Sequence, residues 1–253
     1  MSYQRREKIL EILKRNGTVM LHDLEKIFPD ISSMTLRRDL DFFEKLGEIV
    51  RIRGGAKYIK SLTPSQEDVY ELREIKNQAA KEHIAALAAA YAEDGRSIYI
   101  DSGTTGMYLA RALPDAPFSI VTSGPNIAVE LSKKFKPAIA LVGGFINRTT
   151  LSVSGLQSTE FLKDFNIDIA FIAASAFSAS DGFTCGNKSE CELKKKVIAK
   201  AKKTIILADS TKFDKTMPFT FAHPEKVSVL ITEKQVSDEI AAVAKKSGMK
   251  VEW

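Results

Sequence analysis

The chain has 253 residues, of which 44% are hydrophobic and 27% charged, proportions typical of a globular protein with a buried core. No run approaches the ~20 apolar residues of a membrane helix, and the N-terminus lacks the apolar segment of a signal peptide. A cytoplasmic protein with no membrane contact is therefore expected. The two cysteines and three histidines show no metal-binding spacing, so neither a metal nor another cofactor is predicted.

The net charge of +5 is concentrated near the N-terminus. Residues 1–60 hold 13 Lys/Arg against 9 Asp/Glu, whereas the rest of the chain holds 24 against 23. This distribution indicates that the first quarter of the chain contacts a polyanion. Chance unevenness on a solvated surface is the alternative.

Three short helices are predicted in this first quarter. The first spans about residues 4–16 and ends before a glycine, and the second spans about residues 21–28 and ends at a proline. The third begins after Ser32, whose side chain can accept a hydrogen bond from a free backbone N–H of the first turn.

The third predicted helix has an apolar face and a basic face. On a helical wheel, Leu40 and Phe43 lie within about 40° of Leu36, whereas Arg37 and Arg38 fall on the far side. Both arginines are therefore expected to face away from the core. The alternative is an ordinary solvated helix surface, with Asp41 as an intrahelical partner of the arginines.

Residues 49–59, IVRIRGGAKYI, predict a two-stranded ribbon in which Val50 and Ile52 alternate with arginines before a Gly-Gly turn. Three helices followed by such a ribbon form a winged helix-turn-helix, whose third helix enters the major groove of double-stranded DNA. Arginine can bind guanine or phosphate with two hydrogen bonds. The expected DNA contacts are Ser33, Met34, Thr35, Arg37 and Arg38 on the helix and Arg51, Arg53 and Lys57 on the ribbon.

These motifs resemble a known family. Residues 5–58, with MTLRRDL followed by RGGA, resemble the DNA-binding domain of the DeoR family of bacterial sugar-metabolism regulators. One departure is Met20, where the family usually has a serine or threonine that caps the second helix; a lost cap costs about 1 kcal/mol.

The rest of the chain predicts a second domain, residues 77–253, joined to the first, residues 1–60, by a polar linker over residues 61–76. Short apolar runs alternate with helical stretches, which indicates a mostly parallel sheet covered by helices. The runs are SIYID, FSIVTS, AIALVGG, DIAFIAAS, TIILADS and VSVLITE. An alanine-rich helix around residues 83–91 could pack on this sheet or on a partner subunit.

Small polar residues follow several of these runs, at the strand ends where parallel sheets bind ligands. Residues 101–105, DSGTT, lead into a helix whose free N–H groups and neighbouring hydroxyls suit an anion. Residues 122–126, Gly143-Gly144 and Lys212 follow other runs. A tight structural turn would use the same residue types, and this alternative remains open.

The family resemblance extends over residues 82–233, through DSGTT, GG, SG, DxAF and DSxKF. It implies a sensor domain similar in fold to ribose-5-phosphate isomerase and CoA-transferase subunits, with a phosphorylated sugar as effector. The expected effector contacts are Asp101, Ser102, Gly103, Thr104, Thr105, Thr122, Ser123, Asn126, Gly143, Gly144 and Lys212. The resemblance makes Asp181, Gly182 and Glu190 weaker candidates. Ala176 departs from the glycine that is usual in the family.

The sequence therefore predicts an α/β regulator, a homodimer or homotetramer that represses a sugar-catabolism operon. One alternative is a sugar-phosphate isomerase-like enzyme with a DNA-binding head, for which acids such as Asp101, Asp181 and Glu190 are available. The AASAF loop, residues 173–177, lacks the acidic groups that such an enzyme would need. A second alternative is a DNA-binding protein whose second domain only oligomerises.

Overall fold

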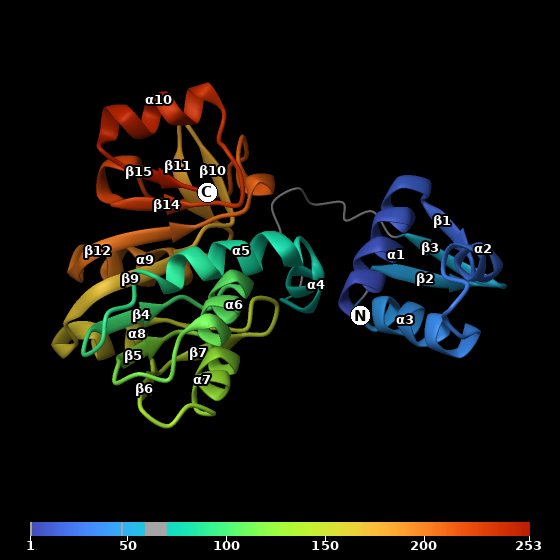
Figure 1. Cartoon of the computed structure of the whole chain (residues 1–253), viewed down its shortest axis with the longest axis horizontal. Helices are drawn as coiled ribbons and strands as arrows, with labels where there is room; N and C mark the ends of the chain where they lie inside the picture. Colours follow the sequence, from blue (N-terminus) through green and yellow to red (C-terminus); the bar gives the residue numbers. More distant parts are fainter. Residues whose placement is uncertain (1, 47, 59–69) are drawn as a thin grey trace. The chain divides into compact units, whose positions relative to one another are not determined.

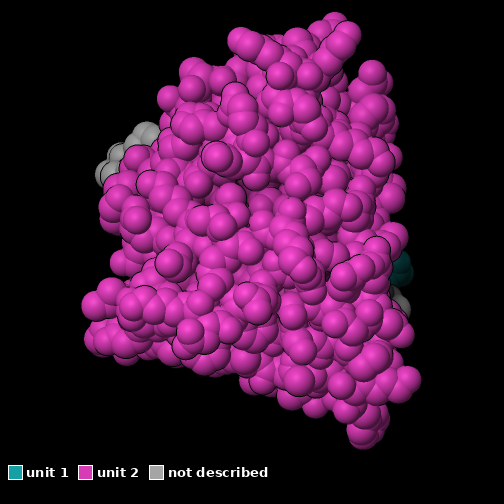
Figure 2. All heavy atoms as spheres, turned by 90° about the vertical axis from the view of Figure 1, so that its left-hand side faces the viewer, with its two compact units in different colours: residues 1–78 teal, residues 79–253 magenta. Residues whose placement is uncertain are grey.

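The computed structural model describes residues 2–46, 48–58 and 70–253 (Figure 1). The chain divides into two compact units, Met1–Gln78 and Ala79–Trp253, coloured separately in Figure 2. Of the predicted linker, residues 61–69 lie outside the described residues, whereas Tyr70–Ile75 forms a helix of the first unit. None of the described helices combines the length and the hydropathy needed to cross a membrane.

The first unit contains the three predicted helices and the predicted ribbon. Its elements are α1 (Ser2–Asn16), β1 (Thr18–Met20), α2 (Leu21–Ile27), α3 (Ser33–Lys45), β2 (Ile49–Ile52), β3 (Gly55–Tyr58) and α4 (Tyr70–Ile75). Leu36, Leu40 and Phe43 of α3 are fully buried among apolar residues of α1 and α2, as the helical wheel predicts. Leu72 and Ile75 of α4 join the same core.

The wing has one strand more than expected, because β1 pairs antiparallel with β3 to give the order β1-β3-β2. This pairing requires Gly55, since a Cβ atom there would lie 2.2 Å from the carbonyl oxygen of Val19. Met20 supplies no side-chain cap to α2; instead the N–H of Leu21 donates to the carbonyl of Gly54 at 2.7 Å. The side chain of Val50 lies outside the described part of the ribbon.

The second unit is built on a sheet of seven described strands, in which every pairing is parallel. The strands are, in spatial order, β15 (Lys250–Glu252), β14 (Val229–Ile231), β12 (Ala201–Leu207), β9 (Ile167–Ala173), β4 (Ser97–Ile100), β5 (Ser119–Thr122) and β6 (Ala138–Leu141). Six of them are the six apolar runs of the sequence. The short β15 was not predicted.

Helices cover both faces of this sheet (Figure 1). They are α5 (Gln78–Ala89), α6 (Thr104–Ala112), α7 (Pro125–Leu131), α8 (Leu156–Phe161), α9 (Lys188–Lys200) and α10 (Asp238–Ser247). The core on one face joins the strands to α5, α6 and α7, and the core on the other joins them to α9 and α10. The alanine-rich helix α5 thus buries Ile84, Ala85 and Ala88 against its own sheet.

Two smaller sheets lie outside the predicted pattern. The hairpin of β7 (Phe145–Asn147) and β8 (Ser152–Ser154) follows β6, and β10 (Ala176–Ser178), β11 (Gly182–Cys185) and β13 (Phe219–Ala222) form an antiparallel sheet. Ala176 is buried in a regular strand and pairs with Thr184. Its methyl group therefore belongs to the packing of this small sheet.

The strand order reverses direction between β4 and β9. From β4 the chain proceeds to β5 and β6 on one side, and from β9 it proceeds to β12, β14 and β15 on the other. In open parallel sheets this switch point leaves a crevice at the carboxyl ends of the two strands, where ligands bind.

Candidate functional site

The outer face of α3 carries unpaired positive charge. The side chains of Arg37 and Arg38 are exposed and form no hydrogen bond or ion pair with any described residue, and Met34 beside them is 61% exposed. Asp41, the intrahelical partner in the alternative interpretation, pairs instead with Arg51 at 3.1 Å. The two arginines are therefore available to a partner outside the chain.

Two of the other predicted contacts on α3 already have partners at the start of the helix. Ser32 caps α3, its hydroxyl accepting from the N–H of Thr35 at 3.3 Å and lying 3.0 Å from the Thr35 hydroxyl. Ser33 donates to Glu25 of α2 at 2.6 Å. The Thr35 bonds close the first turn of α3 and the Ser33 bond joins α3 to α2, so both side chains have a structural role whatever else they contact.

The predicted wing residues divide in the same way. Arg51 donates to Asp41 and lies 3.5 Å from the carbonyl of Arg37, which ties the wing to α3. Arg53 and Lys57 are exposed and pair with no described residue. The basic surface open to a polyanion in this unit thus combines Arg37 and Arg38 with Arg53 at the tip of the wing and Lys57 on its central strand.

Asp39 of the RRD motif was missed by the sequence reasoning. It is 1% exposed and accepts from Arg5 at 2.5 Å and from Arg6 at 2.8 Å, both on α1. The helical wheel could have predicted its burial, because Asp39 lies about 60° from Leu36 on the core side of the helix. Its carboxylate holds α3 against α1.

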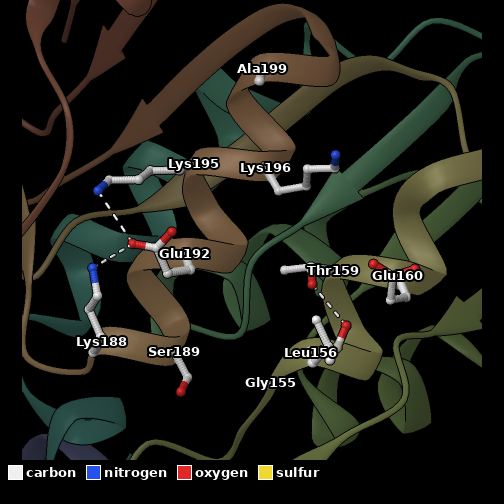
Figure 3. Close-up of a pocket in the computed structure, with 10 residues that line it drawn as sticks. All are labelled: Gly155, Leu156, Thr159, Glu160, Lys188, Ser189, Glu192, Lys195, Lys196 and Ala199. Carbon is white, nitrogen blue, oxygen red and sulfur yellow. Dashed lines mark hydrogen bonds and ion pairs between the residues drawn. The ribbon is translucent and has the colours of Figure 1, made fainter.

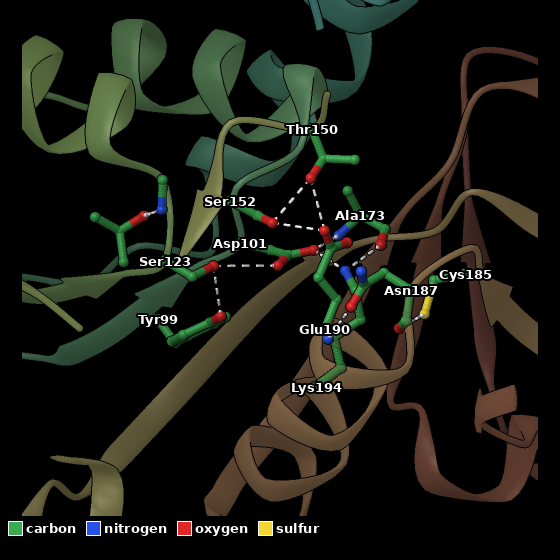
Figure 4. Close-up of polar contacts among 12 residues, drawn as sticks. Tyr99, Asp101, Ser123, Thr150, Ser152, Ala173, Cys185, Asn187, Glu190 and Lys194 are labelled. Carbon is green, nitrogen blue, oxygen red and sulfur yellow. Dashed lines mark hydrogen bonds and ion pairs between the residues drawn. The ribbon is translucent and has the colours of Figure 1, made fainter. Parts of the chain in front are cut away.

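In the second unit, a buried ion pair spans the switch point of the sheet (Figure 4). Asp101 follows β4 and is 3% exposed; its Oδ2 accepts from the N–H of Ala173, the last residue of β9, at 3.1 Å and from Nζ of Lys194 on α9. Lys194 also donates to the carbonyl of Ala173 at 2.9 Å. One carboxylate and one ammonium thus join β4, β9 and α9.

Lys194 was not predicted, because its partner is 93 positions away in the sequence. Burial lowers the pKa of Lys194, but the Asp101 carboxylate, together with Cys185 and Glu190, raises it by more, so the pKa lies above its usual value. With two of its three N–H groups engaged by described residues, the ammonium retains one donor. Asp101 likewise retains capacity, since its Oδ1 has only a 3.5 Å contact with Ser123.

The DSGTT turn carries three hydroxyls within four residues after Asp101. Ser102, Thr104 and Thr105 are only 6–7% exposed, yet none of their hydroxyls hydrogen-bonds to a described residue. Gly103 is required for close packing, because a Cβ atom there would lie 2.5 Å from that of Ala173. The residues after it begin α6, whose first N–H groups face the same turn.

The second predicted loop lies next to the first, since a Cβ atom on Gly124 would come within 3.1 Å of the Cα atom of Ser102. Ser123 accepts from the hydroxyl of Tyr99 at 2.9 Å, and burial raises the pKa of Tyr99, which keeps its proton. Thr122 accepts from the N–H of Gly124 at 3.0 Å. Oδ1 of Asn126 is buried and has no hydrogen-bond partner in the described structure.

Three predicted residues are not joined to Asp101 by any contact between described residues. Gly143 and Gly144 are exposed; the carbonyl of Gly143 accepts from Ser158 at 2.5 Å, and Gly144 packs on Ser154. Lys212 is half-buried after β12, at the same end of the sheet. The structure therefore centres the site on the loops after β4 and β5.

The weaker candidates separate into two groups. Glu190 lies one helical turn before Lys194, and its Oε1 accepts from Thr150 at 2.7 Å and from Ser152 at 2.5 Å, next to the Asp101 network in Figure 4. Asp181, in the β10–β11 turn, instead accepts from the hydroxyls of Thr216 and Ser178, which lower its pKa. Gly182 in that turn has φ +73°. These last two residues stabilise a turn.

The arrangement around Asp101 can bind a polar anion. A helix N-terminus and three free hydroxyls offer donors to an anionic group, while Asp101 Oδ1 and the remaining Lys194 donor can bind hydroxyl groups. Within the described ranges, no group of three or more His, Cys, Asp or Glu side chains is arranged to hold a metal ion.

Comparisons with known proteins found matches to both units of the chain. One family model, described as a DeoR-like helix-turn-helix domain, matches residues 5–62, and another, a DeoR C terminal sensor domain, matches residues 76–234. The HTH-type transcriptional regulator IolR of Bacillus subtilis is 31% identical over 242 residues, 94% of each chain. The L-fucose operon activator of Escherichia coli K12 is 27% identical over 95% of this chain and 99% of its own. Among solved structures, ribose 5-phosphate isomerase A of Methanocaldococcus jannaschii matches 55% of each chain at 17% identity, with a TM-score of 0.41.

Proposed function

Because the chain belongs to the DeoR family of transcriptional regulators, we propose that it represses a sugar-catabolism operon until a phosphorylated sugar binds. In this proposal Arg37 and Arg38 of α3 contact base edges or phosphates in the major groove, and Arg53 and Lys57 of the wing contact phosphates. Support comes from their exposure and from the lack of a described partner for any of the four.

The proposed effector site lies over the switch point of the second unit. The phosphate would bind at the start of α6 and to the hydroxyls of Ser102, Thr104 and Thr105. The sugar hydroxyls would bind Oδ1 of Asp101 and the free donor of Lys194. A single observation carries the proposal: three nearly buried hydroxyls without described partners follow directly after Asp101, whose carboxylate belongs to a buried ion pair.

Thermal unfolding with a panel of sugar phosphates and their unphosphorylated counterparts tests the effector class. At 100 times its dissociation constant, a ligand that binds only the native state adds about 2.7 kcal/mol. We expect stabilisation by a phosphorylated sugar and none by its parent sugar. Operator binding is measured with the same ligand and is expected to weaken. If the parent sugar stabilises the protein equally, the phosphate site is misplaced.

The isomerase alternative is less well supported by the site. A catalytic carboxylate must be free to take a proton from substrate, whereas Asp101 is held by Lys194 and Glu190 is held by two hydroxyls. In the loop after β9, Ala174, Ala176 and Phe177 are buried apolar residues. If NMR detected conversion of the stabilising ligand into a product, the isomerase alternative would be favoured.

A second unit that serves only to oligomerise is also less well supported, because assembly does not require nearly buried hydroxyls without partners. We nevertheless propose that the protein is a homodimer or homotetramer, since two symmetry-related heads can bind two half-sites of an operator.

A further inference from the structure

One side of the second unit exposes large apolar side chains next to a groove. Phe145 and Ile146 of β7 are 77% and 58% exposed, and Leu156 and Phe161 of α8 are 72% and 44% exposed. We call these four residues the apolar patch. Exposed patches of large apolar side chains mark interaction surfaces in soluble proteins.

The groove lies between α8 and α9 and has a volume of about 650 Å³ (Figure 3). It is lined by Gly155, Leu156, Thr159, Glu160, Lys188, Ser189, Glu192, Lys195, Lys196 and Ala199. Leu156 belongs to both the groove and the apolar patch, and a Cβ atom on Gly155 would lie 3.9 Å from the ring of Phe145. Phe145 and Leu156 of the patch therefore adjoin the groove.

Charges along this surface alternate in sign. Lys188, Glu192 and Lys195 follow one another along α9, and Glu192 binds Lys188 at 2.7 Å and Lys195 at 3.4 Å. Across the groove, Glu160 pairs with Lys163 at 2.5 Å. Lys196 also lines the groove and pairs with no described residue, so the lining carries three lysines and two glutamates, and the alternation of charge is a property of the row formed by Lys188, Glu192 and Lys195.

From these observations we propose that the apolar patch and the α8–α9 groove form the surface through which two copies of this chain associate. A two-fold axis sets each patch against the groove of the other copy, and self-complementarity is what such an axis requires. With α9 helices antiparallel and displaced by one turn, Lys188 or Lys195 of each copy would face Glu192 of the other. A small ligand could occupy the groove but would leave Phe145 and Ile146 uncovered.

The surface is joined to the interior by α9 and the β7–β8 hairpin. Glu190 of α9 accepts from Thr150 and Ser152, and Asn147 lies 3.5 Å from the same oxygen, so the hairpin that carries Phe145 is fixed to this helix. The patch is thus a rigid feature of the second unit. This inference deepens the proposed function. It rests on that function only in expecting that two DNA-binding units act as a pair.

Analytical ultracentrifugation of the full chain over a range of concentrations tests the proposal. We expect Phe145→Asp and Leu156→Asp each to raise the dissociation constant for self-association at least about a hundredfold, because a carboxylate would be buried against apolar groups. Phe135→Asp is the matched control: Phe135 is 95% exposed in the loop before β6, at the opposite end of that strand from Phe145. The control should associate like the wild type.

A second measurement exchanges charged residues across the proposed interface and so does not place a new carboxylate among apolar groups. Glu192→Lys alone, and Lys188→Glu with Lys195→Glu, should each weaken self-association, and mixing the two variants should restore it. A monomeric wild type, unchanged association of the variants, equal dissociation of the Phe135→Asp control, or no recovery on mixing would overturn the proposal. Effector stabilisation is measured separately on the wild type, so its absence would count against the effector site alone.

Discussion

The two units of the molecule each contain a buried carboxylate paired with a cation, and the pairs differ in what surrounds them. Asp39 in the first unit has both oxygens bound, one by Arg5 and one by Arg6. Asp101 in the second unit has one oxygen bound by Lys194 and Ala173, while its other oxygen has only a long contact with Ser123. Unused hydrogen-bonding capacity therefore distinguishes a candidate ligand site from a purely structural ion pair.

The largest expected effect comes from replacing Lys194, because the Asp101–Lys194 pair is the more deeply buried of the two. Lys194→Met leaves Asp101 unpaired, and we expect the free energy of unfolding of the second unit to fall by about 3–5 kcal/mol in denaturant titrations. Because pairing raises the pKa of Lys194, this contribution is complete below the unfolded pKa of about 10.4 and is lost as the pH rises through the folded value.

Two controls sharpen this result. Adding Asp101→Asn to Lys194→Met removes both charges and should recover part of the loss, whereas neither variant should respond to effector. Lys245→Met, at an exposed position of α10, should change the stability by less than about 0.5 kcal/mol. A loss for Lys194→Met no larger than that for Lys245→Met would mean that the pair does not form.

Asp39→Ala should have a smaller effect, because the two arginines that it leaves behind can still reach water: their side chains are 13% and 24% exposed. We expect the first unit to lose about 2–3 kcal/mol, measured by hydrogen exchange of the α3 amides. The comparison is with Asp41→Ala, whose side chain is 53% exposed and whose loss should stay below about 1 kcal/mol. Similar losses from the two substitutions would contradict the structural role of Asp39.

Arg38→Ala tests the unpaired charge of the first unit. We expect operator binding to weaken by about 1–3 kcal/mol if the arginine contacts a base, with thermal stability unchanged. The measurement is titration of operator and random DNA at fixed salt. Arg15→Ala, an exposed arginine at the end of α1, is the control. Equal weakening on operator and random DNA would indicate that Arg38 contacts a phosphate. No weakening on either DNA would indicate that Arg38 does not contact DNA.

The smallest effect is expected at Asp168, near the start of β9. Lys202 at 2.8 Å and the N–H of Ser97 at 3.0 Å lower its pKa, so its contribution is present above the unfolded pKa of about 3.9 and is lost as the pH falls through the folded value. Asp168→Asn should therefore reduce stability by less than about 1 kcal/mol at pH 7 and by less still at pH 2. Unfolding curves at the two pH values check this.

Periodic patterns in the sequence correctly predicted the parts of the fold that depend on local spacing. The apolar face of α3 and six of the seven described strands of the large sheet follow from such patterns. The short strands β1 and β15 were missed because neither lies in an apolar run such as the one that contains the equally short β14, and their formation depends on distant partners. For the same reason, the sequence located Asp101 but not Lys194, since no local pattern links residues 93 positions apart.

The position of α9 between two surfaces has a consequence for measurement. Its inner side holds Lys194 at the candidate effector site, and its outer side holds Lys188 and Glu192 at the proposed contact between copies. A ligand that shifts this helix would change the affinity between copies, and by thermodynamic linkage association would change the affinity for ligand by the same factor. Effector titrations at low and high protein concentration would then give different midpoints, and the displacement between the curves would report the free energy of coupling.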